Sequence, residues 1–253
     1  MSLITTSINS DEKTYQIRFY ESIFGTNNID GNISMDRSTD GYTKGIIFEH
    51  KTNVAAYGRS KALSQALIYL TRFNADGIPV PSKIILVCQD KQIAYLYNAN
   101  EYFDIINNIP KYSAMKASSG IEGFAERGLP VEIPFDMTSA TGMRGILTEI
   151  DKPVTYVKVD VNIHNVFGWS LYYYKNAEKH GQKAEKKKFF DELRNPKGTL
   201  SDCINPWTGR EADFTLIMDL LNDPTTQKKR GAFYTPEPYC KVAHKLLEKA
   251  IKR

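Results

Sequence analysis

The sequence has few of the features that mark disulfide-rich, zinc-binding or membrane proteins. Its 253 residues include only three cysteines, Cys88, Cys203 and Cys240, which are odd in number and far apart. They form no Cys-x-x-Cys pair and no cluster with histidine, which argues against structural zinc and suits a reducing compartment. No apolar run approaches bilayer-spanning length, and the opening residues MSLITTS lack the basic and apolar parts of a signal peptide. We therefore expect a cytoplasmic protein with no membrane partner.

Neither charge sign dominates the composition. The 33 Lys and Arg residues only slightly outnumber the 29 Asp and Glu residues, which gives a net charge of +4. This balance permits DNA binding without requiring it. The basic residues concentrate in two stretches, 175–188 and 228–230. Such stretches can follow a phosphate backbone, but a solvated helix face explains them equally well.

The most informative segment is KGIIFEHK, residues 44–51. Its short apolar run, followed by polar residues, predicts a buried strand. Side chains alternate along a strand, so Glu49 and Lys51 should point to one face and His50 to the other. Asp40 precedes the strand, and a turn at Asp40-Gly41 would bring its carboxylate beside Glu49.

These residue types suit phosphodiester hydrolysis with Mg²⁺. Asp40 and Glu49 supply the hard oxygen ligands that Mg²⁺ prefers, and the His50 carbonyl could add a third. Lys51 would hold the attacking water or stabilise charge in the transition state. The alternative is a solvated edge strand with a weak Glu–Lys ion pair.

A helix is predicted before this strand. Asn9 and Glu12 resemble a capping box, which predicts a helix from about Ser10 that ends at Gly25. Glu21 falls within an apolar stripe of that helix, between Ile17 and Phe24. A metal site would explain its position, and a surface glutamate is the alternative.

A second helix is predicted directly after the strand, from Ser60 as N-cap to about Phe73. The leucines at 63, 67 and 70 form its apolar stripe. Gln65, Tyr69 and Arg72 share another face, so Gln65 is expected near the metal and Tyr69 is either at the site or an ordinary boundary residue.

Further along the chain, the runs 84–89 and 92–97 predict a β-hairpin, and 154–161 predicts a strand. The aromatic segment 164–174 could stack on bases, but packing at a domain seam is the favoured interpretation. From about residue 177 the chain is expected to be mostly helical.

The segment TDGYTKGIIFEHK, with the flanking helices, resembles the PD-(D/E)xK nuclease superfamily over about residues 8–100. The resemblance implies an α/β fold whose mixed sheet is flanked by helices. It also implies Mg²⁺ and catalytic roles for Asp40, Glu49 and Lys51. Gln65 and Tyr69 match the Q-x-x-x-Y feature of one branch, whereas Thr39 stands where many members have proline.

A second resemblance lies near the end of the chain, in the segment GAFYTP. It is similar to the opening motif of adenine-N6 DNA methyltransferases of type I and type IIG restriction-modification systems. The matching residues, which the resemblance implies would bind S-adenosylmethionine, are Gly231, Phe233, Tyr234, Thr235 and Pro236. Neither a glycine-rich cofactor turn nor an Asn-Pro-Pro-aromatic motif follows, so we expect S-adenosylmethionine to bind only in a longer, full-length protein.

Together these features predict three segments: a nuclease core (1–110), a late strand and connector that could belong to the same domain (111–176), and a helical spacer leading into a truncated methyltransferase domain (177–253). The expected function is that of a Mg²⁺-dependent DNA endonuclease domain in a fused restriction-modification enzyme. Its expected partners are double-stranded DNA and the remaining methyltransferase and target-recognition parts. The alternatives are a non-catalytic nuclease-like scaffold and an S-adenosylmethionine-binding N-terminal region of a methyltransferase.

Overall fold

The computed structural model of the chain describes residues 11–26, 28–36, 39–43, 45–54, 58–128, 134–181 and 186–215. The predicted capping residue Asn9 and the methyltransferase-like motif at residues 231–236 lie outside these residues.

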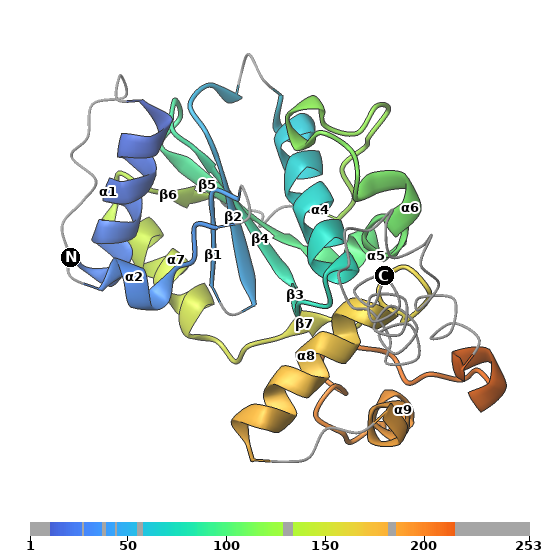
Figure 1. Ribbon diagram of the computed structural model, residues 1–253. Helices are drawn as coiled ribbons and strands as arrows, with labels where there is room; N and C mark the ends of the chain where they lie inside the picture. Colours follow the sequence, from blue (N-terminus) through green and yellow to red (C-terminus); the bar gives the residue numbers. More distant parts are fainter. Residues whose placement is uncertain are drawn as a thin grey trace, which may run out of the picture.

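A five-stranded mixed sheet forms the centre of the molecule (Figure 1). In spatial order its strands are β1 (Gly41–Thr43), β2 (Ile46–Lys51), β4 (Lys83–Cys88), β5 (Ile93–Asn98) and β6 (Phe135–Asp136). Strands β2 and β4 are parallel, and the other neighbours are antiparallel. The predicted mixed sheet, the buried strand after Gly45 and the β4–β5 hairpin are thus confirmed.

Helices cover both faces of this sheet. Helices α1 (Glu12–Phe24) and α7 (Ala140–Asp151) lie on one face, and α4 (Arg59–Ala75) lies on the other (Figure 1). The alternation of β2 creates this arrangement: Ile46 and Phe48 pack in the α1/α7 cluster, whereas Ile47 packs in the α4 cluster. The mixed sheet with flanking helices was therefore predicted correctly at the level of fold class.

Helix α1 begins and packs differently from the prediction. Its N-cap is Asp11, whose side chain accepts a hydrogen bond from the Thr14 amide at 3.0 Å. It ends at Gly25, as predicted, where φ is 84°. The buried stripe consists of Tyr15, Phe19, Tyr20 and Ile23. Ile17 is exposed, so the stripe that was predicted to contain Glu21 does not face the sheet.

Helix α4 links β2 to β4 and so permits their parallel pairing. Its N-cap is Gly58, not the predicted Ser60, whose hydroxyl donates instead to Glu126 at 2.8 Å. The predicted leucine stripe at 63, 67 and 70 is fully buried. Full burial of such a side chain stabilises the fold by about 1.5–3 kcal/mol.

Shorter elements complete the core. They are α2 (Ile29–Asn32), β3 (Val80–Pro81), η1 (Ala99–Tyr102), α5 (Phe103–Asn107), α6 (Ile109–Tyr112), η2 (Ala117–Ser119) and β7 (Tyr156–Val157). Strand β7 pairs only with the two-residue strand β3. The strand predicted over 154–161 is therefore much shorter than expected.

Helices α8 (Val166–Lys179) and α9 (Lys186–Arg194) pack on the same core as α4. Trp169 is fully buried, and the rings of Tyr173 and Phe189 lie 5.5 Å apart. The aromatic segment therefore packs within the protein, and whether it lies at a domain seam stays a prediction. One hydrophobic cluster extends from β2 to Phe214, and β6 adds to the sheet well beyond residue 110. Within the described part of the chain, no helix has both the length and the apolar character needed to cross a bilayer.

Candidate active site

Pairing of β1 with β2 brings the two predicted acids together. Gly41 is opposite Phe48, so Asp40, one residue before β1, lies beside Glu49. The chain reverses at Gly45, where φ is 77°, between the two strands. The predicted juxtaposition of Asp40 and Glu49 is confirmed, but a hairpin produces it and not a turn at Asp40-Gly41.

Lys51 lies between these acids. Its Nζ atom is 2.6 Å from Glu49 Oε1 and 3.9 Å from Asp40 Oδ2. The same ammonium donates a hydrogen bond to the His50 carbonyl at 2.6 Å. Glu49 and Lys51 thus share one face of β2, as predicted, and the ammonium is held by three oxygen atoms.

An open cavity of about 590 Å³ contains this cluster. Helix α4 contributes Gln65 and Tyr69 to its wall, so Gln65 lies beside the acids as expected, and Tyr69, for which two positions were open, lies at the cavity. Arg72, on the same predicted face, instead donates to the carbonyls of Ser113 and Met115. Among the described residues, the lining consists of Glu12, Asp40, Glu49, Lys51, Thr52, Asn53, Gln65, Tyr69 and Ser118.

Two buried oxygen atoms in this wall have no hydrogen-bond partner among the residues that the structure describes. They are Oε2 of Glu49 and Oε1 of Gln65, in side chains that are 1% and 5% exposed. Leaving a buried polar group unpaired costs about 1–3 kcal/mol. Such a cost is expected at a site that binds something, because a ligand can satisfy the atoms that the protein does not.

Burial and repulsion by neighbouring carboxylates also shift the pKa values of the two acids upward. Burial raises the pKa of Asp40, and the Lys51 ammonium opposes that shift. Burial, followed by the Asp40 charge, raises the pKa of Glu49 to about 8. Burial alone would lower the pKa of Lys51, but the Glu49 carboxylate keeps it above the usual value. One ammonium therefore does not fully compensate the two carboxylates, and a further cation would stabilise their ionised forms.

His50 contributes only its backbone to the cavity side. Its amide donates to Asp40 Oδ2 at 2.7 Å, and its carbonyl accepts from Lys51. The imidazole lies on the opposite face, where Nε2 is 3.2 Å from the Tyr20 hydroxyl. Burial, with a smaller effect from Lys51, lowers the pKa of His50 to about 3, so the ring is neutral.

Of the two interpretations of Glu21, a metal-site acid or a surface glutamate, its position fits the second. Glu21 does not line the cavity, whereas Glu12, in the first turn of the same helix, does. The two residues are about two and a half turns apart, which puts them on opposite sides of the helix. Glu12 accepts a hydrogen bond from Thr52 at 3.2 Å. The sequence signal that was missed is the side of the helix on which the buried stripe lies. That side faces the ends of the strands, and Glu12 lies on it.

The sequence also gave no signal for the wall around Ser118. Ser64 on α4 accepts a hydrogen bond from the Ile121 amide at 3.0 Å. Glu126 accepts from Arg59 at 3.1 Å and from Ser60 at 2.8 Å. These contacts hold the segment after η2 against the first turns of α4 and so place Ser118 at the cavity.

The oxygen atoms around this cavity can bind a hard divalent cation if carboxylate, amide and backbone carbonyl oxygens act together. Among the residues that the structure describes, no three His, Cys, Asp or Glu side chains gather as a ready set of metal ligands. Asp40 and Glu49 supply two carboxylates, and the Gln65 amide and His50 carbonyl supply neutral oxygens. Mg²⁺ commonly binds through one or two carboxylates and keeps several waters, so this set fits it.

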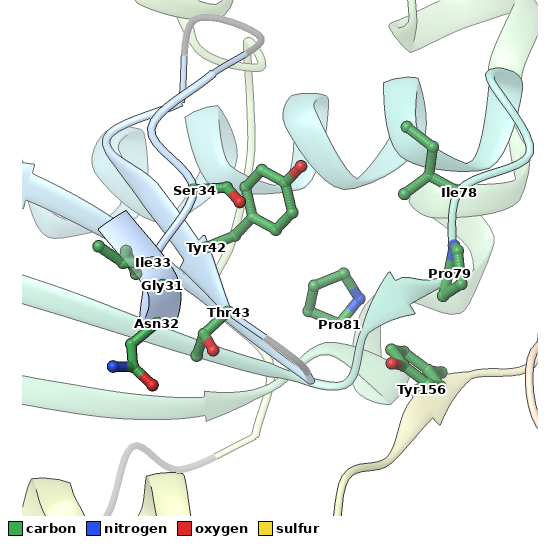
Figure 2. Close-up of a pocket in the computed structure, with 10 residues that line it drawn as sticks. All are labelled: Gly31, Asn32, Ile33, Ser34, Tyr42, Thr43, Ile78, Pro79, Pro81 and Tyr156. Carbon is green, nitrogen blue, oxygen red and sulfur yellow. The ribbon is translucent and has the colours of Figure 1, made fainter. Parts of the chain in front are cut away.

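Another cavity, of about 410 Å³, lies between β1 and the β3–β7 pair (Figure 2). Its described lining has tyrosine but no carboxylate, histidine, cysteine or lysine, and Figure 2 shows Pro79 and Pro81 beside Tyr156. It therefore lacks the carboxylates that would bind a hard divalent cation, and the cavity around Glu49 is the better candidate.

Comparison of the chain with protein-family models, curated protein sequences and solved structures found no match.

Proposed function

We propose that this chain contains a Mg²⁺-dependent endonuclease site that hydrolyses phosphodiester bonds in double-stranded DNA. The observation that carries the proposal is the meeting of Asp40, Glu49 and Lys51 in one open cavity, where Glu49 Oε2 is buried with no hydrogen-bond partner in the described part of the chain. The resemblance of residues 39–51 to PD-(D/E)xK nucleases, stated above, supports the same reaction.

The metal would be held by Asp40 and Glu49, with the Gln65 amide and the His50 carbonyl as neutral donors. When bound, Mg²⁺ lowers the pKa of water and neutralises negative charge on a phosphate. The raised pKa of Glu49, about 8, supports this assignment because a cation would relieve the repulsion that raises it.

Lys51 has the role of orienting water and stabilising charge. Its ammonium is fixed by Glu49, Asp40 and the His50 carbonyl, so it donates from a defined position. A fixed donor needs little reorganisation when negative charge develops on a phosphate, which makes it effective in the transition state. Thr52, Asn53 and Tyr69 surround the cluster with neutral groups that can hydrogen-bond to phosphate or sugar oxygens.

We further propose that the site is the cutting part of a fused restriction-modification enzyme. The support is the methyltransferase-like segment 231–236, which follows the nuclease-like segment in the order found in single-chain enzymes of this kind. S-adenosylmethionine and target recognition would then belong to further parts of the full-length protein.

The test is plasmid cleavage by the intact protein with Mg²⁺. Wild type should convert supercoiled plasmid, and Glu49→Gln and Lys51→Ala should not. Glu21→Gln is the matched control, because it removes an acid from α1 that does not face the cavity. Equal cleavage by wild type and Glu49→Gln would remove the proposal.

A further inference from the structure

Behind the proposed site, a buried polar pair lies on the opposite face of β2. Tyr20 on α1 and His50 on β2 are 0% and 1% exposed. His50 Nε2 is 3.2 Å from the Tyr20 hydroxyl, which in turn donates to the Asp40 carbonyl at 3.1 Å. The His50 amide donates to the Asp40 carboxylate at 2.7 Å. Asp40 is thus held at its backbone and at its side chain by the same two neighbours.

Close packing fixes both rings. The Phe19 and His50 rings meet edge to face at 5.1 Å, and the Tyr20 and Phe48 rings do so at 5.5 Å. Gly41 makes room for the hydroxyl, because a Cβ atom there would lie 2.3 Å from the Tyr20 oxygen. Glycine at this position therefore lets Tyr20 reach the backbone next to Asp40.

The hydrogen-bond directions determine the histidine tautomer. Tyr20 has one hydroxyl proton, and its contact with the Asp40 carbonyl uses it. His50 must then donate Nε2–H to the Tyr20 oxygen, which leaves Nδ1 without a proton. Among the described residues Nδ1 has no hydrogen-bond partner, so no other contact competes with this tautomer.

We propose that Tyr20 and His50 are positioning residues that hold Asp40 beside Glu49 from behind the sheet. The inference rests on the proposed function, because it concerns the acids of that site. Two neighbouring carboxylates repel each other, and Asp40 sits at the start of the edge strand β1, where it could rotate toward solvent. Residues that hydrogen-bond to a metal ligand typically change metal affinity 10- to 100-fold. We therefore expect Tyr20 and His50, called the anchor of Asp40 below, to affect metal binding.

Tyr20→Phe tests the anchor, and Tyr15→Phe is its matched control. Both variants remove one buried hydroxyl from the same face of α1, but only Tyr20 contacts Asp40. In the metal-free chain, Tyr20→Phe should increase hydrogen exchange at the His50 amide by roughly tenfold or more relative to neighbouring amides of β2. It should also raise the Mn²⁺ dissociation constant, measured by calorimetry, about tenfold. Tyr15→Phe should change neither quantity.

His50 variants provide a second test if Tyr20→Phe does not fold. His50→Gln keeps an N–H that can donate to Tyr20 and should bind Mn²⁺ like wild type, whereas His50→Leu should be about tenfold weaker. Nitrogen chemical shifts of the His50 ring should show the proton on Nε2, and a proton on Nδ1 would overturn the proposed hydrogen-bond order.

The outcomes separate this inference from the proposed function. If wild type and the Glu49→Gln variant bind Mn²⁺ equally, or neither binds, the proposed metal site is overturned. The proposed role of Tyr20 and His50 is then overturned as well. If wild type binds Mn²⁺ and neither Tyr20→Phe nor His50→Leu changes that affinity or the His50 amide exchange, the anchor alone is overturned.

Discussion

Asp40 and Glu49 face each other across the β1–β2 hairpin because Gly41 is paired with Phe48. The two acids therefore sit at matching positions of neighbouring strands, with Lys51 two residues further along β2 on the Glu49 side. This arrangement places three charged side chains in a half-buried space, and it explains both the raised pKa of Glu49 and the salt bridge that limits the rise. The following predictions depend on it.

Glu49→Gln should abolish cleavage while leaving the protein folded. The variant removes a metal ligand and the partner of Lys51, so we expect activity to fall by on the order of 10³-fold. The melting temperature without metal should change little, because glutamine has nearly the same size and its amide oxygen can still accept a hydrogen bond from Lys51. Plasmid cleavage and thermal unfolding in EDTA measure the two effects. A fall in both would indicate a structural role only.

The stability of the metal-free protein should decrease as pH rises. Glu49 has a pKa of 4.5 when unfolded and about 8 when folded, so the folded state holds the proton more tightly. Its contribution to stability is complete below the unfolded pKa and is lost as pH rises toward and through the folded pKa. Urea unfolding in EDTA should give a lower free energy of unfolding at about pH 8.5 than at about pH 5.5. Glu49→Gln should reduce that difference in the free energy of unfolding. If the difference is unchanged in the variant, groups other than Glu49 cause the pH dependence.

Glu12 and Glu21 should differ in their effect on metal binding although they lie on one helix. Glu12 lines the cavity and Glu21 does not. Glu12→Gln should weaken Mn²⁺ binding about 3- to 10-fold, because it removes a negative charge that lies near the metal without binding it directly. Glu21→Gln should bind Mn²⁺ like wild type. Calorimetry at low salt is the measurement. A stronger effect of Glu21→Gln would contradict the placement of α1.

Gln65→Leu should separate stability from function. The Gln65 amide oxygen is buried without a partner, so a leucine of similar size should leave the free energy of unfolding unchanged or raise it by about 1 kcal/mol. Cleavage and Mn²⁺ affinity should nevertheless fall. Leu63→Ala on the same helix is the opposite control, because it should destabilise the fold by about 2–5 kcal/mol without touching the cavity. Loss of stability in Gln65→Leu would assign that residue to the core.

Elements with a strong local period were predicted well from the sequence. The strand ending at Lys51, the leucine stripe of α4 and the β4–β5 hairpin each depend on neighbours a few residues away. The pairing of Asp40 with Glu49 was also predicted, although the position of the reversal was not. Gly45 supplies that reversal through its positive φ, and the Asp40-Gly41 pair only resembled a turn.

Contacts that depend on tertiary packing could not be predicted in this way. The choice between Glu12 and Glu21 depends on which side of α1 meets the sheet, and aromatic residues occur on more than one side of that helix. Ser118 is held at the cavity by hydrogen bonds between Ser64 and Ile121 and between Ser60 and Glu126. The partners are 57 and 66 positions apart in the sequence, so no local periodicity could indicate these contacts. The strand expected over 154–161 is reduced to Tyr156–Val157, which pair with the two residues of β3.

The hairpin at Gly45 also limits which insertions and deletions the protein can tolerate during evolution. Strand side chains alternate faces, so inserting or deleting a single residue in this connection would either turn Asp40 away from Glu49 or displace it along the sheet. The loop is therefore a point where small length changes would disable the charged cluster without touching any of its members. Comparison of natural variants should find its length held constant wherever the acids are kept.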